Sequence, residues 1–221
     1  MKKSDIKKKL RALLRKHLLA QPGAVRSLVP STVTDGKLYE AHVLSLVVEK
    51  LAVQEKYALV LTGGSKVQLK SSPGPINRKY PRIDLRKNGI LRAELWTDVE
   101  FLSLSHAARG LSTTTLGDFH ELDLLIVEAG QSDRPTHDKV WLGVECKHTS
   151  YQKGLLKEIL GIRRELSLLT DLQPTQFSTW PRPRVPADPP SCLLVYSTDP
   201  SVKNYEAPGS IFGIDFVHEP L

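Results

Sequence analysis

The sequence contains few cysteines and no long apolar segment. Cys146 and Cys192 are the only two cysteines, and both lie in apolar runs typical of strands. This number and spacing provide neither a disulfide framework nor the ligands of a zinc site, and they suit a reducing compartment. A membrane helix requires roughly 18 consecutive apolar residues, and no segment approaches this length. The sequence therefore favours a soluble protein with no membrane partner.

The N-terminus also lacks the continuous apolar core and the small-residue cleavage site of a secretory signal. The expected location is therefore cytoplasmic. Hydrophobic residues make up 40% of the 221 residues, which is enough for one domain with its own core.

Positive charge is concentrated at the N-terminus. Residues 1–20 hold eight lysines and arginines and one acidic residue, an excess equal to the formal net charge of +7 of the whole chain. Apolar residues recur there at helical spacing, which predicts a basic amphipathic helix and linker over 1–30, ahead of a domain over 31–221. The basic face would either contact nucleic-acid phosphates or simply be solvated. The candidate contacts on it are Lys7, Lys8, Arg11 and Arg15.

The rest of the chain alternates between helical and strand patterns. Apolar periodicity predicts helices over 37–53 and 151–169. Segments rich in proline and glycine predict loops over 71–89 and 173–190. Alternating or continuous apolar runs predict strands, one of them bent or turning near Asp98, over 57–62, 66–69, 93–105, 121–128, 140–147, 192–197 and 211–217. This order predicts an α/β fold.

Acidic residues interrupt two of these apolar segments. Asp123 lies between leucines, and an ionised carboxylate in such a strand is costly without a partner or a metal ion. Glu145 and Lys147 lie two positions apart in the next strand, so their side chains share a face. If the two strands pair, Asp123 and Glu145 come within reach of one divalent cation that prefers oxygen ligands.

Glu40 is a further candidate for this site, and the reasons for choosing it are independent of the two strands. The apolar stripe formed by Leu44, Val47 and Leu51 extends back onto Glu40, so this acid faces the sheet. A metal-bound water would then be the nucleophile, and Lys147 would orient it or support the transition state. These residue types together predict phosphodiester hydrolysis.

This set of residues resembles the motif of PD-(D/E)XK nucleases, over roughly residues 36–200. The resemblance implies a restriction-endonuclease-like core, with a central mixed sheet flanked by helices, in the order helix, three to four strands, helix, strand. It implies that Asp123 and Glu145 bind Mg²⁺ together with the backbone carbonyl of Cys146, and that Mn²⁺ can substitute. By the same resemblance, Glu40 is an auxiliary ligand through water and Lys147 is the catalytic lysine.

Other charged residues are weaker candidates for the site. Glu121 shares the strand face of Asp123 and is kept as a reserve ligand. Glu94 and Glu100 could add a further ligand, although solvated strand charges are the commoner case, and both stay unassigned. The basic residues of the helix predicted over 151–169 would contact phosphates or serve solubility alone, and those selected are Lys153, Arg163 and Arg164.

The expected function is a Mg²⁺-dependent endonuclease that cleaves duplex DNA in restriction, defence or recombination. Three alternatives stay open: a nuclease acting on RNA or single strands, a non-catalytic module that binds nucleic acid or protein, and an effector controlled by a regulatory partner chain. Cleavage of both strands would favour a homodimer.

Overall fold

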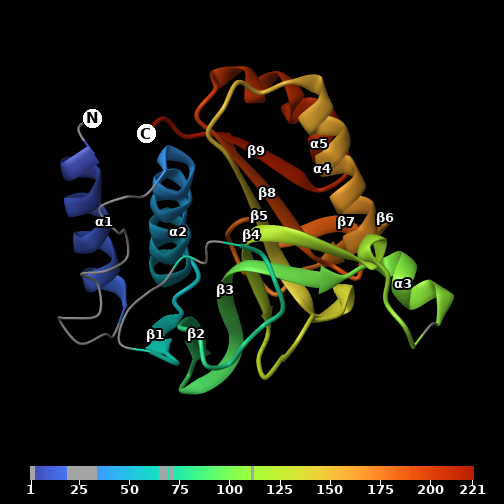
Figure 1. The fold of residues 1–221 in the computed structure, drawn as a ribbon, viewed down its shortest axis with the longest axis horizontal. Coiled ribbons are helices and arrows are strands. Elements are labelled where there is room, and N and C mark those ends of the chain that lie inside the picture. Colours follow the sequence, from blue (N-terminus) through green and yellow to red (C-terminus); the bar gives the residue numbers. More distant parts are fainter. Residues whose placement is uncertain (1–2, 19–33, 65–68, 70–71, 111) are drawn as a thin grey trace.

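A mixed sheet forms the centre of the protein in the computed structural model, which describes residues 3–18, 34–64, 69, 72–110 and 112–221 (Figure 1). Within these residues the sheet has seven strands in the order β1-β2-β3-β4-β5-β8-β9. Strands β1 to β5 pair antiparallel, whereas β5, β8 and β9 are parallel. The strand bounds are β1 Ala58–Thr62, β2 Arg82–Lys87, β3 Ile90–Leu102, β4 Phe119–Glu128, β5 Val140–Lys147, β8 Cys192–Ser197 and β9 Ile214–His218.

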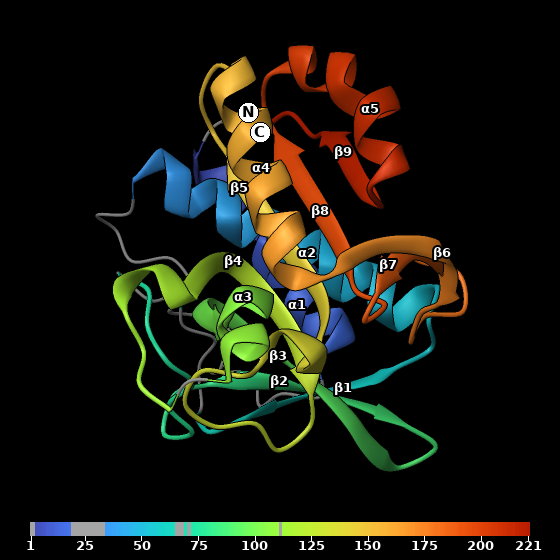
Figure 2. The same cartoon turned by 90° about the vertical axis from the view of Figure 1, so that its right-hand side faces the viewer.

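Helices cover both faces of this sheet. Figures 1 and 2 place α1 and α2 on one side and α4 and α5 on the other. A separate two-stranded sheet, formed by β6 and β7, lies between α4 and β8 in the chain. The remaining bounds are α1 Lys3–His17, α2 Asp35–Val53, α3 Leu104–Arg109, α4 Lys153–Leu166, β6 Leu168–Pro174, β7 Arg184–Asp188 and α5 Glu206–Ile211, with short 3-10 helices at Leu116–Asp118, His137–Lys139 and Pro200–Tyr205.

Two apolar clusters hold the layers together. On one face, α2 packs Leu44 and other apolar residues against strand residues such as Leu142 and Leu194. On the other face, Ile159 of α4 packs in the cluster that contains Leu125. Helix α2 is buried along most of its length because α1 packs on its outer side, which explains why its apolar residues are not confined to one stripe. The position of α2 is therefore fixed from two sides.

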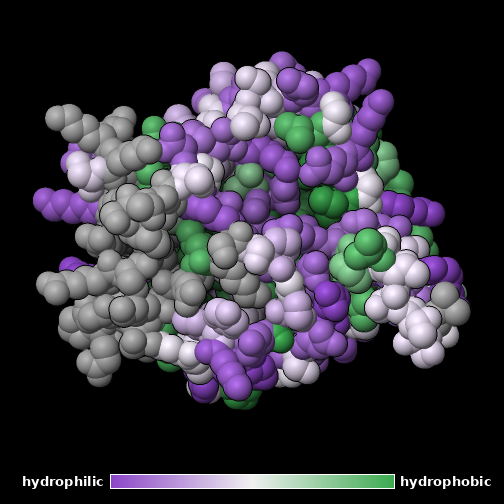
Figure 3. All heavy atoms as spheres, viewed as in Figure 1, coloured by the Kyte–Doolittle hydropathy of each residue, from purple (hydrophilic) through white to green (hydrophobic). Residues whose placement is uncertain are grey.

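The α/β class and the central mixed sheet flanked by helices are confirmed. The predicted helix over 37–53 corresponds to α2, and the predicted strands over 121–128, 140–147 and 192–197 correspond to β4, β5 and β8. The predicted boundary between residues 30 and 31 lies outside the described residues. Among the residues that are described, no helix is both long and apolar enough to cross a membrane. On the face seen in Figure 3, apolar residues form separate patches within a largely hydrophilic surface.

Three predicted elements are wrong in part. The expected loop over 71–89 contains β2, which pairs with both β1 and β3. The strand expected over 66–69 lies, except for Leu69, outside the described residues. The expected loop over 173–190 contains β7, whose single proline, Pro186, is tolerated in a two-stranded sheet. The helix expected over 151–169 ends at Leu166, and β6 follows it. For β6 and β7, pairing between the two strands overrides the local composition. Strand β2 instead forms a hairpin with β3 through the two residues Asn88-Gly89, both with positive φ.

Two further strands differ at their ends. The strand expected over 93–105 is β3, which ends at Leu102 and is followed by α3. Its bend is at Asp98, which has a φ of 50° and separates the pairs Thr97↔Leu124 and Val99↔Leu122. The left-handed backbone here turns the strand without ending it. The last strand begins at Ile214 rather than at 211, because α5 precedes it.

Glu55, just beyond α2, anchors the segment between β6 and β7. Its carboxylate is 1% exposed and accepts hydrogen bonds from the backbone N–H groups of Ser178 (2.7 Å), Thr179 and Trp180 (2.8 Å). One buried carboxylate thus satisfies three consecutive donors that would otherwise lack partners.

Replacing Glu55 with glutamine is therefore expected to lower the free energy of unfolding by about 1–3 kcal/mol, because the amide cannot accept all three bonds. Urea unfolding measures the change. Glu49→Gln, within α2 and with a side chain that is 39% exposed, should change stability by less than about 0.5 kcal/mol. Equal effects of the two variants would contradict the anchoring role.

Candidate active site

The two central antiparallel strands, β4 and β5, separate at the candidate site. At this end of the ladder the last pair in register is Leu124↔Val144. Beyond this pair, the backbone N–H of Cys146, two residues after Val144, donates a hydrogen bond of 2.7 Å to Oδ2 of Asp123, one residue before Leu124. The Asp123 carboxylate therefore lies in the opening between the strands.

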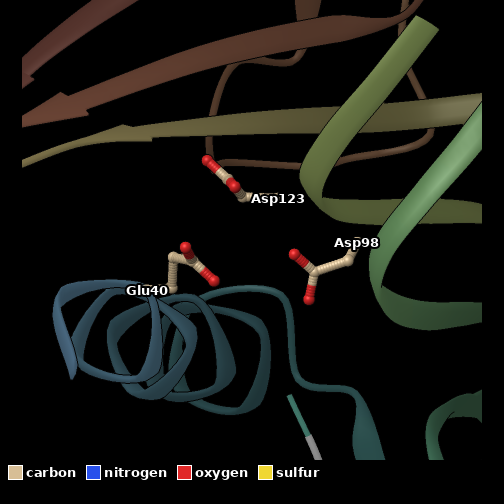
Figure 4. A group of neighbouring side chains, drawn as sticks. All are labelled: Glu40, Asp98 and Asp123. Atoms are coloured by element: carbon tan, nitrogen blue, oxygen red, sulfur yellow. The ribbon is translucent and has the colours of Figure 1, made fainter. Parts of the chain in front are cut away.

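Three acids from three elements meet beside this opening. Glu40 comes from α2, Asp98 from the bend in β3 and Asp123 from β4, and Figure 4 shows their carboxylates directed toward one space. One oxygen of each lies within 4.8 Å of an oxygen of the others. Glu40 and Asp98 are buried and Asp123 is partly buried. Ionised carboxylates this close repel one another strongly unless a cation lies among them.

A lysine already contacts two of these acids. Lys37 Nζ is 2.7 Å from Glu40 Oε2 and 2.5 Å from Asp98 Oδ1. The contact with Glu40 follows from their i, i+3 spacing in α2, a helix that the Thr34 hydroxyl caps at its first turn. Burial opposes the charge on Lys37, but the hydrogen bonds to Asp98 and Glu40 prevail and raise its pKa above the ordinary value.

The predicted acid and lysine of β5 form a second ion pair. Lys147 Nζ lies 2.7 Å from Glu145 Oε1 and 3.1 Å from Glu158 Oε1 of α4. Burial, followed by the charge of Asp123, raises the pKa of Glu145 to about 8. Burial and Asp123 likewise raise the pKa of Glu40 to about 7 against the opposing effect of Lys37. Burial also raises the pKa of Asp123. The site therefore holds more negative charge than its own lysines neutralise.

An open cleft of about 460 Å³ exposes part of this arrangement. Asp123, Glu145 and Lys147 line it from the sheet, and Glu158 and Gly161 line it from α4. Most of the side chains that line the cleft are polar or charged, and the carboxylates of Asp123 and Glu145 are among them. Such a shape suits a polar, extended substrate rather than a small apolar ligand.

Asp123 connects the four predicted catalytic residues, which do not form a single compact group of ligands. Asp123 belongs to the carboxylate group with Glu40, and it lines the cleft with Glu145 and Lys147. Among the described residues, Glu145 lies outside the group whose oxygens approach within 4.8 Å. The reserve ligand Glu121 also lines the cleft.

Sequence reasoning missed Asp98 and Lys37 as members of the site. Asp98 has the same signal as Asp123, because it is an acid within the apolar run from Leu95 to Leu102, and it is 1% exposed. Its proximity to Asp123 depends on the pairing of β3 with β4. Lys37 carries no comparable signal, because a lysine in the first turn of a helix is ordinary.

The residues predicted to contact nucleic acid fall into three groups: exposed residues, residues whose side chains are not described, and one buried residue. Lys8, Arg15, Lys153 and Arg164 are exposed, as phosphate contacts must be. The side chains of Lys7 and Arg11 lie outside the described residues.

Arg163, in contrast, is a correction. It is 4% exposed and donates hydrogen bonds to the Ser191 carbonyl (2.7 Å) and the Ser191 hydroxyl (2.8 Å). Arg163 is not among the residues that line the cleft, and its hydrogen bonds link α4 to the start of β8. Burial lowers its pKa to about 10.

The commoner case of a solvated charge does not hold for Glu94. Glu94 is fully buried, and its carboxylate accepts two hydrogen bonds from Arg78, of 2.8 and 3.0 Å. This paired charge ties the segment before β2 to the sheet and takes no part in the cleft. Glu100 is partly buried and pairs with Arg134 at 2.7 Å.

Comparisons with protein-family models, with curated proteins and with solved structures find no match to this chain. The site must therefore be interpreted from its own geometry.

The carboxylate cluster predicts a particular pH dependence for the metal-free protein. Glu40 and Glu145 have pKa values of about 7 and about 8, against an ordinary value of 4.5, so the folded chain retains protons that the unfolded chain releases. This contribution to stability is complete below pH 4.5 and is lost as the pH rises through 7 and 8.

Urea unfolding in EDTA at about pH 5, 7 and 9 measures the effect, and Glu145→Gln should show a shallower decline than the unmodified protein. A free energy of unfolding that rises over this range, or an unchanged slope in Glu145→Gln, would contradict the assignment.

Proposed function

We propose that this chain is a metal-dependent endonuclease that hydrolyses phosphodiester bonds, with duplex DNA as its substrate. The observation that carries the proposal is the convergence of Glu40, Asp123 and Glu145 with Lys147 where β4 and β5 separate, beside an open cleft. Buried acids and a lysine at the end of two strands are costly for folding, and catalysis explains why they are there.

The donor set fits a hard divalent cation. Carboxylate oxygens are the ligands that Mg²⁺ prefers, and Mn²⁺ accepts the same ligands. Asp123 and Glu145 would hold the ion with the backbone carbonyl of Cys146, Glu40 would act through water, and Asp98 adds a further carboxylate. When bound, the ion would supply an acidified water and would offset the charge on the phosphate.

The chain's own residues supply the remaining requirements. Lys147 lies in the cleft beside Glu145, where its ammonium can orient a water or contact a phosphate oxygen. The exposed residues Lys153 and Arg164 on α4 and Lys8 and Arg15 on α1 suit contacts to the phosphate backbone that do not depend on sequence. The order of α2, antiparallel strands, α4 and β8 is also the order that the resemblance to PD-(D/E)XK nucleases implies.

Cleavage of supercoiled plasmid tests this proposal. With Mg²⁺ or Mn²⁺ the protein should cut, and with EDTA it should not. Lys147→Ala should lower the rate by about 100-fold or more, because a charged group aimed at the reacting phosphate is lost. Asp123→Ala should abolish cleavage.

Lys139→Ala is the matched control, because Lys139 pairs with Glu128 outside the cleft. Cleavage that is unaffected by Lys147→Ala and Asp123→Ala would refute the proposed site. Parallel assays on single-stranded DNA and RNA determine the substrate, and cleavage of RNA alone would replace DNA in the proposal.

Gly161 provides a second prediction. It lines the cleft from α4, and a Cβ placed on it meets no described atom within 4 Å. Gly161→Phe should thus fill the cleft without disturbing the helix, in which phenylalanine is more favourable than glycine. We expect plasmid cleavage to fall at least about tenfold, because the strand is displaced, whereas cleavage of the small diester bis(p-nitrophenyl) phosphate persists.

Gly154→Phe is the control on the same helix, since Gly154 is equally open. Equal loss on both substrates, or equal effects of the two glycine variants on plasmid cleavage, would show that the cleft does not guide the strand.

A further inference from the structure

The basic side chain of Lys37 contacts two members of the carboxylate group, Glu40 and Asp98. Its side chain is 27% exposed, while those of Asp98 and Glu40 are 1% and 12% exposed. The ammonium is thus largely removed from water. Two charge-assisted hydrogen bonds of 2.7 and 2.5 Å hold it there.

The charges at the site indicate how many ions it can hold. Within the cluster itself, Glu40, Asp98 and Asp123 carry three formal negative charges when ionised, and Lys37, which contacts two of them, carries one positive charge. One divalent cation makes this group neutral. A second would leave a net charge of +2 in a partly buried site, which is unfavourable unless substrate phosphates offset it.

The position of Lys37 adds a steric argument. A second ion shared by Glu40 and Asp98 would take the place of the Lys37 ammonium or lie a few ångströms from it, and like charges at such separations repel strongly in a low-dielectric site. Lys37 would have to leave two short ion pairs to admit that ion.

We propose that the Lys37 ammonium occupies one of the two cation positions of the carboxylate cluster, so that the chain binds a single divalent ion, on the Asp123 side. Lys37 is then a positioning residue that holds Glu40 and Asp98 and sets the number of ions. This inference rests on the proposed metal-dependent function, and it concerns the stoichiometry of the ion rather than the cleavage reaction.

Calorimetric titration with Mn²⁺, in the absence of substrate, tests the inference on the full chain. The unmodified protein should bind one Mn²⁺. Lys37→Met, which removes the charge and keeps a side chain of similar length, should bind two. The double variant Lys37→Met/Asp98→Asn should return to one, because removing a carboxylate offsets the lost ammonium.

Lys50→Met is the matched control, since Lys50 lies on the same helix outside the cluster, and it should bind one ion. If Lys37→Met fails to fold without metal, far-UV circular dichroism should show that Mn²⁺ restores its structure, whereas the double variant folds without the ion.

Two ions bound by the unmodified protein, or one ion bound by Lys37→Met with unchanged affinity, would overturn the inference and leave a nuclease function intact. Failure of Mn²⁺ to restore an unfolded Lys37→Met chain would also overturn it. One ion in the unmodified protein and two in Lys37→Met, without any cleavage of nucleic acid, would support the inference while the proposed function fails. No binding by any variant would overturn both.

Discussion

Repulsion between carboxylates is the constraint on which the rest of this site depends. Asp123 lies between two separating strands, and the fold places Glu40 and Asp98 within a few ångströms of it. A protein without use for this arrangement would avoid its cost, because like charges in a partly buried place destabilise the folded chain. The two lysines reduce that cost without removing it. The remaining negative charge is the basis on which we propose a divalent cation there.

The scaffold explains how acids so far apart in sequence are held against their repulsion. Helix α2 is fixed between α1 and the sheet, so Glu40 cannot withdraw. The bend at Asp98 is held by the pairs on both of its sides, and the carboxylate of Asp123 receives the N–H of Cys146. The connection through α4, β6 and β7 returns the chain to form parallel β8 and also supplies the far wall of the cleft. The packing of these elements therefore stabilises an arrangement of charges that would be unfavourable by itself.

The sequence predicts the part of the site that lies within single elements. Asp123 and the Glu145–Lys147 pair follow from acids in apolar strands, and Glu40 follows from helical spacing. Asp98 could not be placed, because its position requires the register of β3 on β4 and a left-handed backbone. The burial of Arg163 could not be predicted either, because a helix pattern does not show which later loop packs beside it. Strand β7 is predicted as a loop for a similar reason, because its strand character depends on pairing with β6. Strand β2 does have a local signal, because Asn88-Gly89 is the two-residue turn that joins it to β3.

The most direct test of the central claim, that these carboxylates hold a divalent cation, is a crystal structure of the chain grown with Mn²⁺, with diffraction data collected at the manganese absorption edge. The account predicts one anomalous peak within coordination distance, about 2.0–2.4 Å, of an Asp123 carboxylate oxygen, with Lys37 still paired to Asp98. An empty cluster at saturating Mn²⁺, or a peak only on exposed acids elsewhere, would contradict it.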